Sequence, residues 1–268
     1  KLDICKGERV AQALKSIKPS YICHLAALAS VWRSYKAMQQ TFRVNFEGTM
    51  NLLEAAHLLD GIRKFLFVSS ADCYGVFSPK NKTLTEDQPL NPISPYALSK
   101  AVAEQACRYY QSRHRLPVTV ARSFPHTGPR QSVDFVVPSF ARQIADIEAT
   151  RKKPIIRVGN LSARRDFSDV RDIVRGYRLM LQQGKPGQVY HLSSGRTVSI
   201  ESVLHRLLAL SSKKIRVLVD KTRFRLADIP IQRGDNRRAV QELGYESRYS
   251  VNTTFRDTLE YWRQQVHA

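Results

Sequence analysis

A tyrosine and a lysine four residues apart, Tyr96 and Lys100, are the residues of this sequence best suited to acid–base chemistry. Ser94 is a good helix N-cap and Pro95 fits the first helical position, so we expect Tyr96 in the first turn of a helix. Residues i and i+4 share a helix face, which places the ammonium beside the phenol. Its charge would lower the phenol pKa from about 10, so that the phenol can exchange a proton at a carbonyl or alcohol.

Two serines, Ser69 and Ser70, end the apolar run 63–70, which predicts a buried strand. Open α/β sheets bind ligands at the carboxyl ends of their strands, so a hydroxyl there could hold a substrate oxygen while Tyr96 transfers the proton. Each feature also has a structural interpretation: a surface Tyr/Lys pair, and a serine that caps the chain. These residues alone leave both interpretations open.

Strand and helix patterns alternate in the part of the chain that carries these residues. Helical spacing predicts helices over 8–17, 37–59 and 95–114, and apolar runs predict strands at 20–25, 63–70 and 117–123, with Trp32 in a loop. Later segments predict helices at 138–149, 169–183, 199–210 and 253–266, and strands at 155–158 and 188–194. The alternation predicts an α/β fold with a parallel sheet, followed by a smaller lobe.

Length and charge limit the functional classes. The 268 residues suffice for one domain, or one with a small appendage, and no apolar run approaches the ~20 residues of a membrane span. The N-terminus lacks the apolar core of a signal peptide. The net charge of +20 is spread along the chain, which favours attraction of small polyanions such as nucleotide diphosphates. Nucleic-acid binding is less favoured, because no Arg/Gly-rich or aromatic-interleaved tract is present.

The four cysteines are Cys5, Cys23, Cys73 and Cys107, and none has CxxC or Cys/His metal spacing. We expect reduced thiols, a cytoplasmic location and no metal site.

A series of segments resembles the extended short-chain dehydrogenases/reductases that act on nucleotide sugars. In chain order the segments are HLAA (24–27), VNFEGTMNLLEAA (44–56), SSADCYG (69–75), SPYALSK (94–100), RSFPHTGPRQ (122–131), VGNLSARRDFSDVRDIVRGY (158–177) and YHLSSGRTVSI (190–200). Residues 158–177 and 223–245 are most similar to the GDP-4-dehydro-6-deoxy-mannose reductases, which make GDP-rhamnose. The resemblance implies a Rossmann-type fold, NAD or NADP as cofactor, a GDP-sugar substrate, and a homodimer through the helices at 37–59 and 95–114.

The same resemblance implies residue roles. Tyr96 would be the general acid toward the 4-keto group, Lys100 would lower its pKa and hold the nicotinamide ribose, and Ser70 would hydrogen-bond the carbonyl oxygen. The remaining cofactor-binding residues would be Asp3, Ile4, Ala26, Ala27, Asn45 and His126, and the substrate-binding residues Asp72, Asn160, Arg165, Arg225 and Asp228. Alternatively, Arg165 and Asp166 form a surface ion pair, and Asp228 caps a helix. Residues 1–157 with 170–195 would form a partial dinucleotide-binding domain, and 158–169 with 196–268 the sugar-nucleotide lobe.

The sequence departs from the family pattern at several points. The G-x-x-G-x-x-G loop that binds the pyrophosphate is missing, so we expect a fragment or an altered relative, with residues 20–25 at an open sheet edge. Pro125 stands where the family usually has Asn, and Leu226 replaces a proline. Asp72 stands where the related 4,6-dehydratases have Glu, which favours a reductase. A dehydratase, an epimerase and a non-catalytic sugar-nucleotide binder remain alternatives, and the sequence cannot choose between NAD and NADP.

Overall fold

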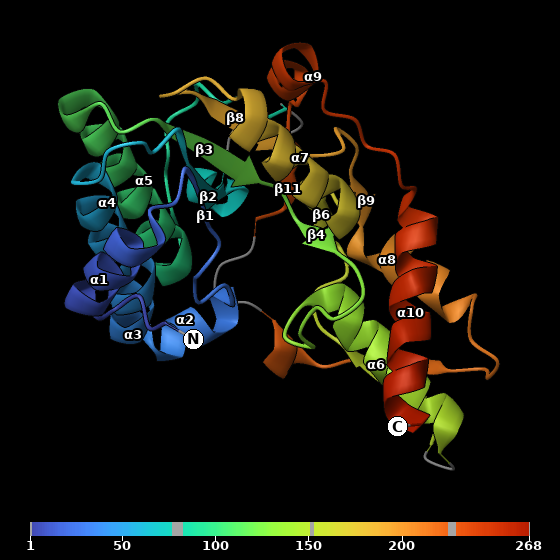
Figure 1. Ribbon diagram of the computed structural model, residues 1–268. Coiled ribbons are helices and arrows are strands. Elements are labelled where there is room, and N and C mark those ends of the chain that lie inside the picture. Colours follow the sequence, from blue (N-terminus) through green and yellow to red (C-terminus); the bar gives the residue numbers. More distant parts are fainter. Residues whose placement is uncertain (1, 77–82, 151–152, 225–228, 268) are drawn as a thin grey trace.

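The computed structural model of the chain describes residues 2–76, 83–150, 153–224 and 229–267 (Figure 1). The helices are α1 (Gly7–Ile17), α2 (Val31–Lys36), α3 (Met38–Phe42), α4 (Gly48–His57), α5 (Pro95–His114), α6 (Val136–Ala149), α7 (Val170–Gln183), α8 (Ile200–Leu208), α9 (Arg237–Leu243) and α10 (Val251–His267). Shorter helical turns are the π turn η1 (Arg43–Glu47) and the 3₁₀ turns η2 (Ala71–Tyr74) and η3 (Lys221–Arg223). The strands are β1 (Tyr21–His24), β2 (Lys64–Ser70), β3 (Val118–Ser123), β4 (His126–Thr127), β5 (Ile155–Val158), β6 (Arg164–Arg165), β7 (Ser168–Asp169), β8 (Val189–Leu192), β9 (Val198–Ser199), β10 (Arg216–Val219) and β11 (Ile231–Gln232).

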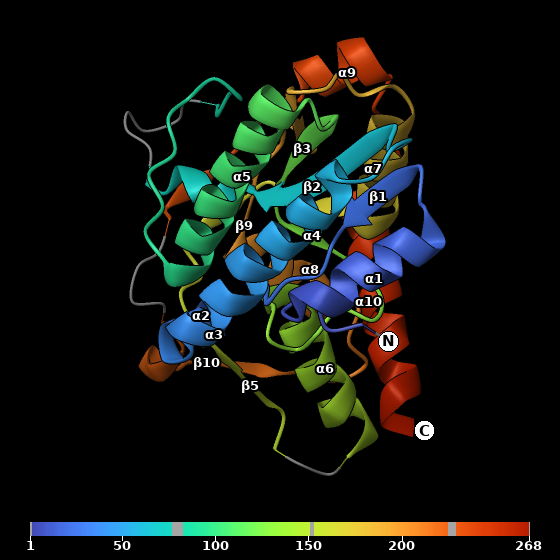
Figure 2. The same ribbon diagram turned by 60° about the vertical axis from the view of Figure 1, so that its left-hand side comes forward.

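The main sheet is parallel, in the order β1-β2-β3-β8. Its strands β1, β2 and β3 can be followed in Figure 2. Helices cover both of its faces. Phe65 and Phe67 of β2 pack into a core with α1, α4 and α5, whereas Leu66 between them packs against α7 and α9. Burial on both faces explains why β2 is apolar at consecutive positions. The predicted α/β fold with a parallel sheet is confirmed.

One edge of this sheet is open in the described part of the chain, as the sequence predicted. There β1 pairs only with β2. Ile22 and His24 point into the core, and the alternate side chains Tyr21 and Cys23 are exposed.

A second core lies beyond the sheet and joins α6, α8 and α10 to β5 (Figure 1). Its buried side chains include Ile144, Ile156, Leu204, Phe255 and Leu259. The predicted boundary had assigned α6 and β5 to the dinucleotide-binding domain and α9 to the sugar-nucleotide lobe. Instead α6 buries its apolar face against α8 and α10, and α9 packs on the main sheet. We therefore propose that the second lobe takes in 136–158 and leaves α9 with the first.

Trp32 was expected in a loop but lies in α2. Ser30 begins this helix, because its hydroxyl accepts a hydrogen bond from the backbone N–H of Arg33 at 3.3 Å. The predicted helix 37–59 is a continuous helical run through α3, η1 and α4. Among the residues that the structure describes, no helix combines the length and the apolar character that crossing a membrane requires.

Candidate active site

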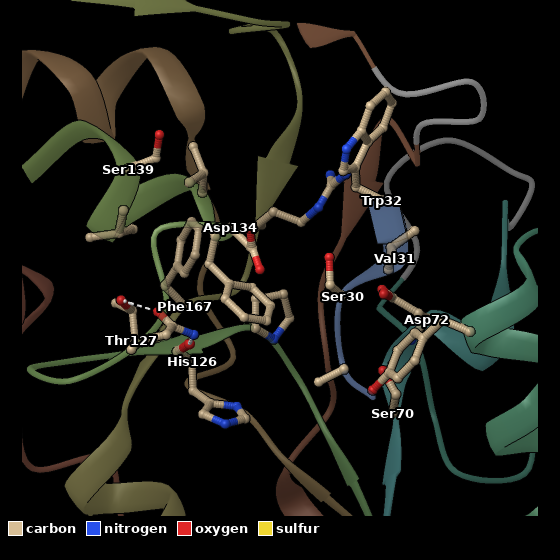
Figure 3. A pocket seen from close by; sticks show the side chains of 18 of the residues that line it. Ser30, Val31, Trp32, Ser70, Asp72, His126, Thr127, Asp134, Ser139 and Phe167 are labelled. Carbon is tan, nitrogen blue, oxygen red and sulfur yellow. Dashed lines mark hydrogen bonds between the residues drawn. The ribbon is translucent and has the colours of Figure 1, made fainter. Parts of the chain in front are cut away.

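A pocket of about 770 Å³ lies between the carboxyl end of the main sheet and the second lobe. Eight of the predicted site residues line it: Ala27, Ser70, Asp72, Tyr96, Lys100, His126, Asn160 and Arg165. Figure 3 shows Ser70 and Asp72 on one wall and His126, Thr127 and Phe167 on the wall facing them. The pocket therefore brings together residues from β2, α5, β4 and the β5–β6 segment, which are far apart in sequence.

The backbone of Tyr96 is held by hydrogen bonds at both its N–H and its carbonyl group. Ser94 caps α5 by accepting from the N–H of Ala97 at 3.1 Å, and Pro95 follows at the start of the helix, as predicted. The N–H of Tyr96 donates to the hydroxyl of Ser34 in α2 at 3.1 Å, and its carbonyl accepts from Ser99 at 2.7 Å. These bonds fix the ring at the pocket wall.

The expected decrease in the Tyr96 pKa does not occur. Burial raises this pKa above the ordinary value of tyrosine, and the nearby Asp72 carboxylate raises it further. The Ser70 hydroxyl, which interacts with that of Tyr96, only partly offsets these effects. The helical spacing of Tyr96 and Lys100 was predicted correctly, but the ammonium is not what governs the phenol. Tyr96 is therefore a protonated phenol at neutral pH, and its raised pKa makes it a weaker acid than an exposed tyrosine.

Lys100 is a buried cation, 4% exposed, whose Nζ lies 4.4 Å from the centre of the Phe67 ring. It makes no hydrogen bond or ion pair with any side chain or backbone group of the described chain, although it lines the pocket. Burial lowers its pKa to about 8. Three N–H donors thus remain for a ligand.

Replacing Lys100 by methionine is expected to stabilise the protein near pH 7 by up to about 3 kcal/mol, because the buried charge is removed. Since the folded pKa of Lys100 lies below the unfolded one, the unfolded wild type binds more protons between about pH 8 and about 10.5. The free energy of unfolding of the wild type should rise over that window. The stability difference between the Lys100→Met variant and the wild type should therefore shrink toward zero. Urea unfolding of both proteins at several pH values measures this stability difference. Exposed Lys15→Met is the control; a Lys100→Met difference independent of pH would contradict the expectation.

The segment after Ser70 is a tight 3₁₀ turn. The Ser70 hydroxyl accepts from the N–H of Asp72 at 3.2 Å, and Gly75 ends the turn at φ +63°. A Cβ at Gly75 would lie 1.9 Å from the carbonyl oxygen of Asn91, so only glycine fits there. This turn directs Ser70 and Asp72 into the pocket.

The facing wall carries His126, whose Nδ1 donates to the carbonyl of Phe124 at 2.9 Å. Burial lowers the pKa of His126, which favours the neutral imidazole. Pro125, at the family's usual Asn position, lines the pocket, and its carbonyl accepts from the N–H of Ser168 at 3.0 Å. The side-chain oxygen Oδ1 of Asn160 accepts hydrogen bonds from both the backbone N–H and the hydroxyl of Ser162.

Arg165 and Asp166 do not form a surface pair, so that alternative is wrong. Arg165 is 8% exposed, and its guanidinium donates to the carbonyls of Arg164 and Ile229. Asp166 is fully buried, and its carboxylate accepts from Ser194, Gly195 and Gly234. Burial raises the pKa of Asp166, although these donors act against it.

Four predicted cofactor residues lie outside the pocket lining. Ile4 packs against Gly48, the carboxylate of Asp3 accepts from the N–H of Cys5 at 3.0 Å, and Ala26 is exposed. Asn45, in the π turn η1, bonds both backbone groups of Leu28 and the hydroxyl of Ser99. It thereby ties the segment after β1 to α5. Arg225 and Asp228 lie outside the described residues.

Several pocket residues were not predicted as site residues. Trp32, Asp134, Tyr177 and Arg223 line the pocket, and Arg33 on α2 reaches Asp134 in an ion pair of 2.9 Å. A helical pattern after Ser30 could have signalled Trp32. The others come from loops or buried helix faces whose placement depends on the tertiary fold.

The donor set fits the nicotinamide end of a dinucleotide. The Lys100 ammonium and the Tyr96 phenol line the same pocket as the small side chains of Ala27 and Ala29, which lie in the segment after β1. Among the described residues, no group of histidine, cysteine and acidic side chains could hold a metal ion.

The family model of GDP-mannose 4,6 dehydratase matches residues 1–258. The chain belongs to this family. The resemblance to extended short-chain dehydrogenases/reductases is thus confirmed, and solved structures of such enzymes share the fold. The structure of RMD from Pseudomonas aeruginosa complexed with NADPH has a TM-score of 0.91 at 29% identity, over 99% of this chain and 88% of that one. A UDP-glucose 4-epimerase from Thermus thermophilus, in complex with NAD, has a TM-score of 0.88 at 25% identity, over 98% and 83%.

Curated relatives of the family include both reductases and dehydratases. The GDP-6-deoxy-D-mannose reductase of Pseudomonas aeruginosa is 31% identical over 92% of this chain and 82% of its own length. The human dTDP-D-glucose 4,6-dehydratase is 28% identical over 99% of this chain and 75% of its own length. The family therefore modifies nucleotide sugars.

Proposed function

We propose that this protein reduces the 4-keto group of GDP-4-keto-6-deoxy-mannose to give GDP-rhamnose. The observation that carries the proposal is that Ser70, Tyr96 and Lys100 line one pocket at the carboxyl end of β2. The similarity to a GDP-6-deoxy-D-mannose reductase supports the choice of substrate, and the NADPH and NAD complexes of related structures support a nicotinamide cofactor.

A bound nicotinamide cofactor would supply the hydride. In our proposal Tyr96 donates its proton to the 4-oxygen as C4 is reduced, and Ser70 holds that oxygen by a hydrogen bond. Burial and Asp72 raise the pKa of the Tyr96 phenol, which keeps it protonated but makes it a weaker acid, so this role needs a cation to stabilise the phenolate as the proton leaves. Lys100 offsets the charge left on the phenolate and holds ribose hydroxyls. Tyr96 is then reprotonated from solvent.

The substrate would extend from this centre toward the second lobe. Asn160 and Arg165, which line the same pocket, are proposed to contact the sugar nucleotide. Arg225 and Asp228 are proposed to bind its diphosphate and ribose. The net charge of +20 favours approach of such a dianion.

The test is turnover of GDP-4-keto-6-deoxy-mannose with NADPH or NADH, followed by the loss of reduced cofactor and by NMR of the product. We expect one GDP-6-deoxyhexose per cofactor oxidised. The Pseudomonas aeruginosa reductase serves as the positive control. No turnover by this chain, while the control is active, would overturn the proposal.

A dehydratase is the second candidate, favoured by the family model. It would consume GDP-mannose itself without net oxidation of the cofactor, which the same NMR assay detects. A non-catalytic protein would bind GDP-sugars without turnover of either substrate. The homodimer and the cytoplasmic location stay predictions.

A further inference from the structure

A hydrogen bond joins the second lobe to the centre of the proposed chemistry. Nε2 of Gln232 donates to Oδ1 of Asp72 at 3.0 Å, although the two residues are 160 positions apart in sequence. Gln232 is 1% exposed, and Asp72 lines the pocket wall beside Ser70. The carboxylate nearest the phenol is therefore tied to the other lobe.

The strand β11 fixes the position of this amide. Gln232 pairs with Arg165 of β6, and its carbonyl accepts from the N–H of Asp166 at 3.0 Å. The N–H of Arg164 donates to the carbonyl of Pro230 at 2.8 Å, so the strand is bonded on both sides of the position. These backbone bonds hold the main chain on both sides of the amide.

Chemistry decides which way the amide faces. An ionised carboxylate only accepts hydrogen bonds, so the NH₂ group of Gln232 must face Asp72. The amide oxygen is then buried with no partner in the described part of the chain. An unpaired buried acceptor costs stability, which a leucine of similar size would avoid. The cost is consistent with a function exerted through Asp72.

Asp72 influences the Tyr96 phenol through the negative charge of its carboxylate. The Asp72 carboxylate is the largest charge effect on Tyr96. Cys73 in η2 and Tyr177 in α7 also face it, but burial raises the pKa of each to about 12, so both stay neutral. The positive side chains lining the same pocket are Lys100 in α5, Arg157 in β5, Arg165 in β6 and Arg223 in η3.

We propose that Gln232 is a positioning residue for proton transfer: its amide fixes the Asp72 carboxylate beside Tyr96. The inference rests on the proposed reduction, in which negative charge develops on the 4-oxygen before the proton of Tyr96 arrives. A misplaced or second negative charge there would oppose that step.

The test compares three variants of the full chain. Gln232→Leu removes the donor at similar volume and should lower kcat about 10- to 100-fold with KM nearly unchanged, because the carboxylate is no longer fixed. Gln232→Glu creates two touching carboxylates, which share one proton at low pH and lose it at higher pH. Its kcat should match the wild type at low pH and fall at least about tenfold as the pH rises.

The swap Asp72→Asn with Gln232→Glu keeps one carboxylate and one amide in exchanged places. It should abolish the additional pH dependence of Gln232→Glu. A merely structural link would lower the melting temperature of Gln232→Leu but leave the kcat profiles of all variants parallel to the wild type, and that result would overturn the inference while the reductase function stands. An inactive wild type would instead overturn the reductase function and this inference with it.

Discussion

Replacing Tyr96 by phenylalanine is expected to lower kcat for the keto sugar by about 100- to 10,000-fold, the range that a positioned general acid contributes. Only one oxygen is lost, and the ring keeps its buried contacts in the first turn of α5. KM for the sugar nucleotide should therefore change little. Steady-state kinetics of the variant, with cofactor loss followed at saturating substrate, measure both constants.

Tyr177→Phe is the matched control. Tyr177 is another buried tyrosine of the same pocket, and its hydroxyl lies 2.9 Å from that of Ser123. Loss of this hydroxyl removes a hydrogen bond but no proton donor, so we expect kcat to change less than about tenfold. Equal losses in the two variants would show that Tyr96 has no special part in proton transfer.

The location of Tyr96 and Lys100 could be predicted because it depends on local rules. A serine cap, a proline at the first helical position and a spacing of four residues define the start of α5 without reference to the rest of the chain. The strand end that carries Ser70 follows from the apolar run 63–70 and from the direction of parallel strands.

The electrostatics of the site could not be predicted, because burial decides them. Spacing places an ammonium near the phenol of Tyr96, but only the packed structure shows that desolvation and Asp72 dominate its pKa. Likewise the Gln232–Asp72 bond joins segments 160 residues apart, and no local pattern signals it. The lobe boundary that we propose differs from the predicted one for the same reason: the apolar face of α6 could suit either core, and it packs with α8 and α10.

Replacing Arg122 by methionine is expected to destabilise the protein by about 3–5 kcal/mol, because it leaves a buried carboxylate without its partner. The side chains of Arg122 and Glu104 are 1% and 0% exposed, and two N–H groups of Arg122 donate to the carboxylate at 2.6 and 3.1 Å. A third donates to the Tyr74 hydroxyl at 2.5 Å, which in turn donates to Nε2 of His191 at 2.6 Å. The network therefore also anchors the η2 turn that follows Ser70.

Arg108→Met is the control, because Arg108 contacts the same carboxylate at 3.3 Å but is 48% exposed. Urea unfolding near pH 7 should show a cost below about 1 kcal/mol for this exposed partner. Glu104→Leu combined with Arg122→Met should recover part of the loss, since no uncompensated charge remains. Burial acts to raise the pKa of Glu104, but the hydrogen bonds and the charge of Arg122 outweigh this effect, so the pKa is lowered. The Arg122–Glu104 pair therefore contributes its full stabilisation above the unfolded glutamate pKa of about 4.3. This contribution to the free energy of unfolding is lost as the pH falls through the lower folded pKa. The two arginines share one partner and differ in burial, so equal costs would mean that desolvation of Glu104 does not control the stability of this core.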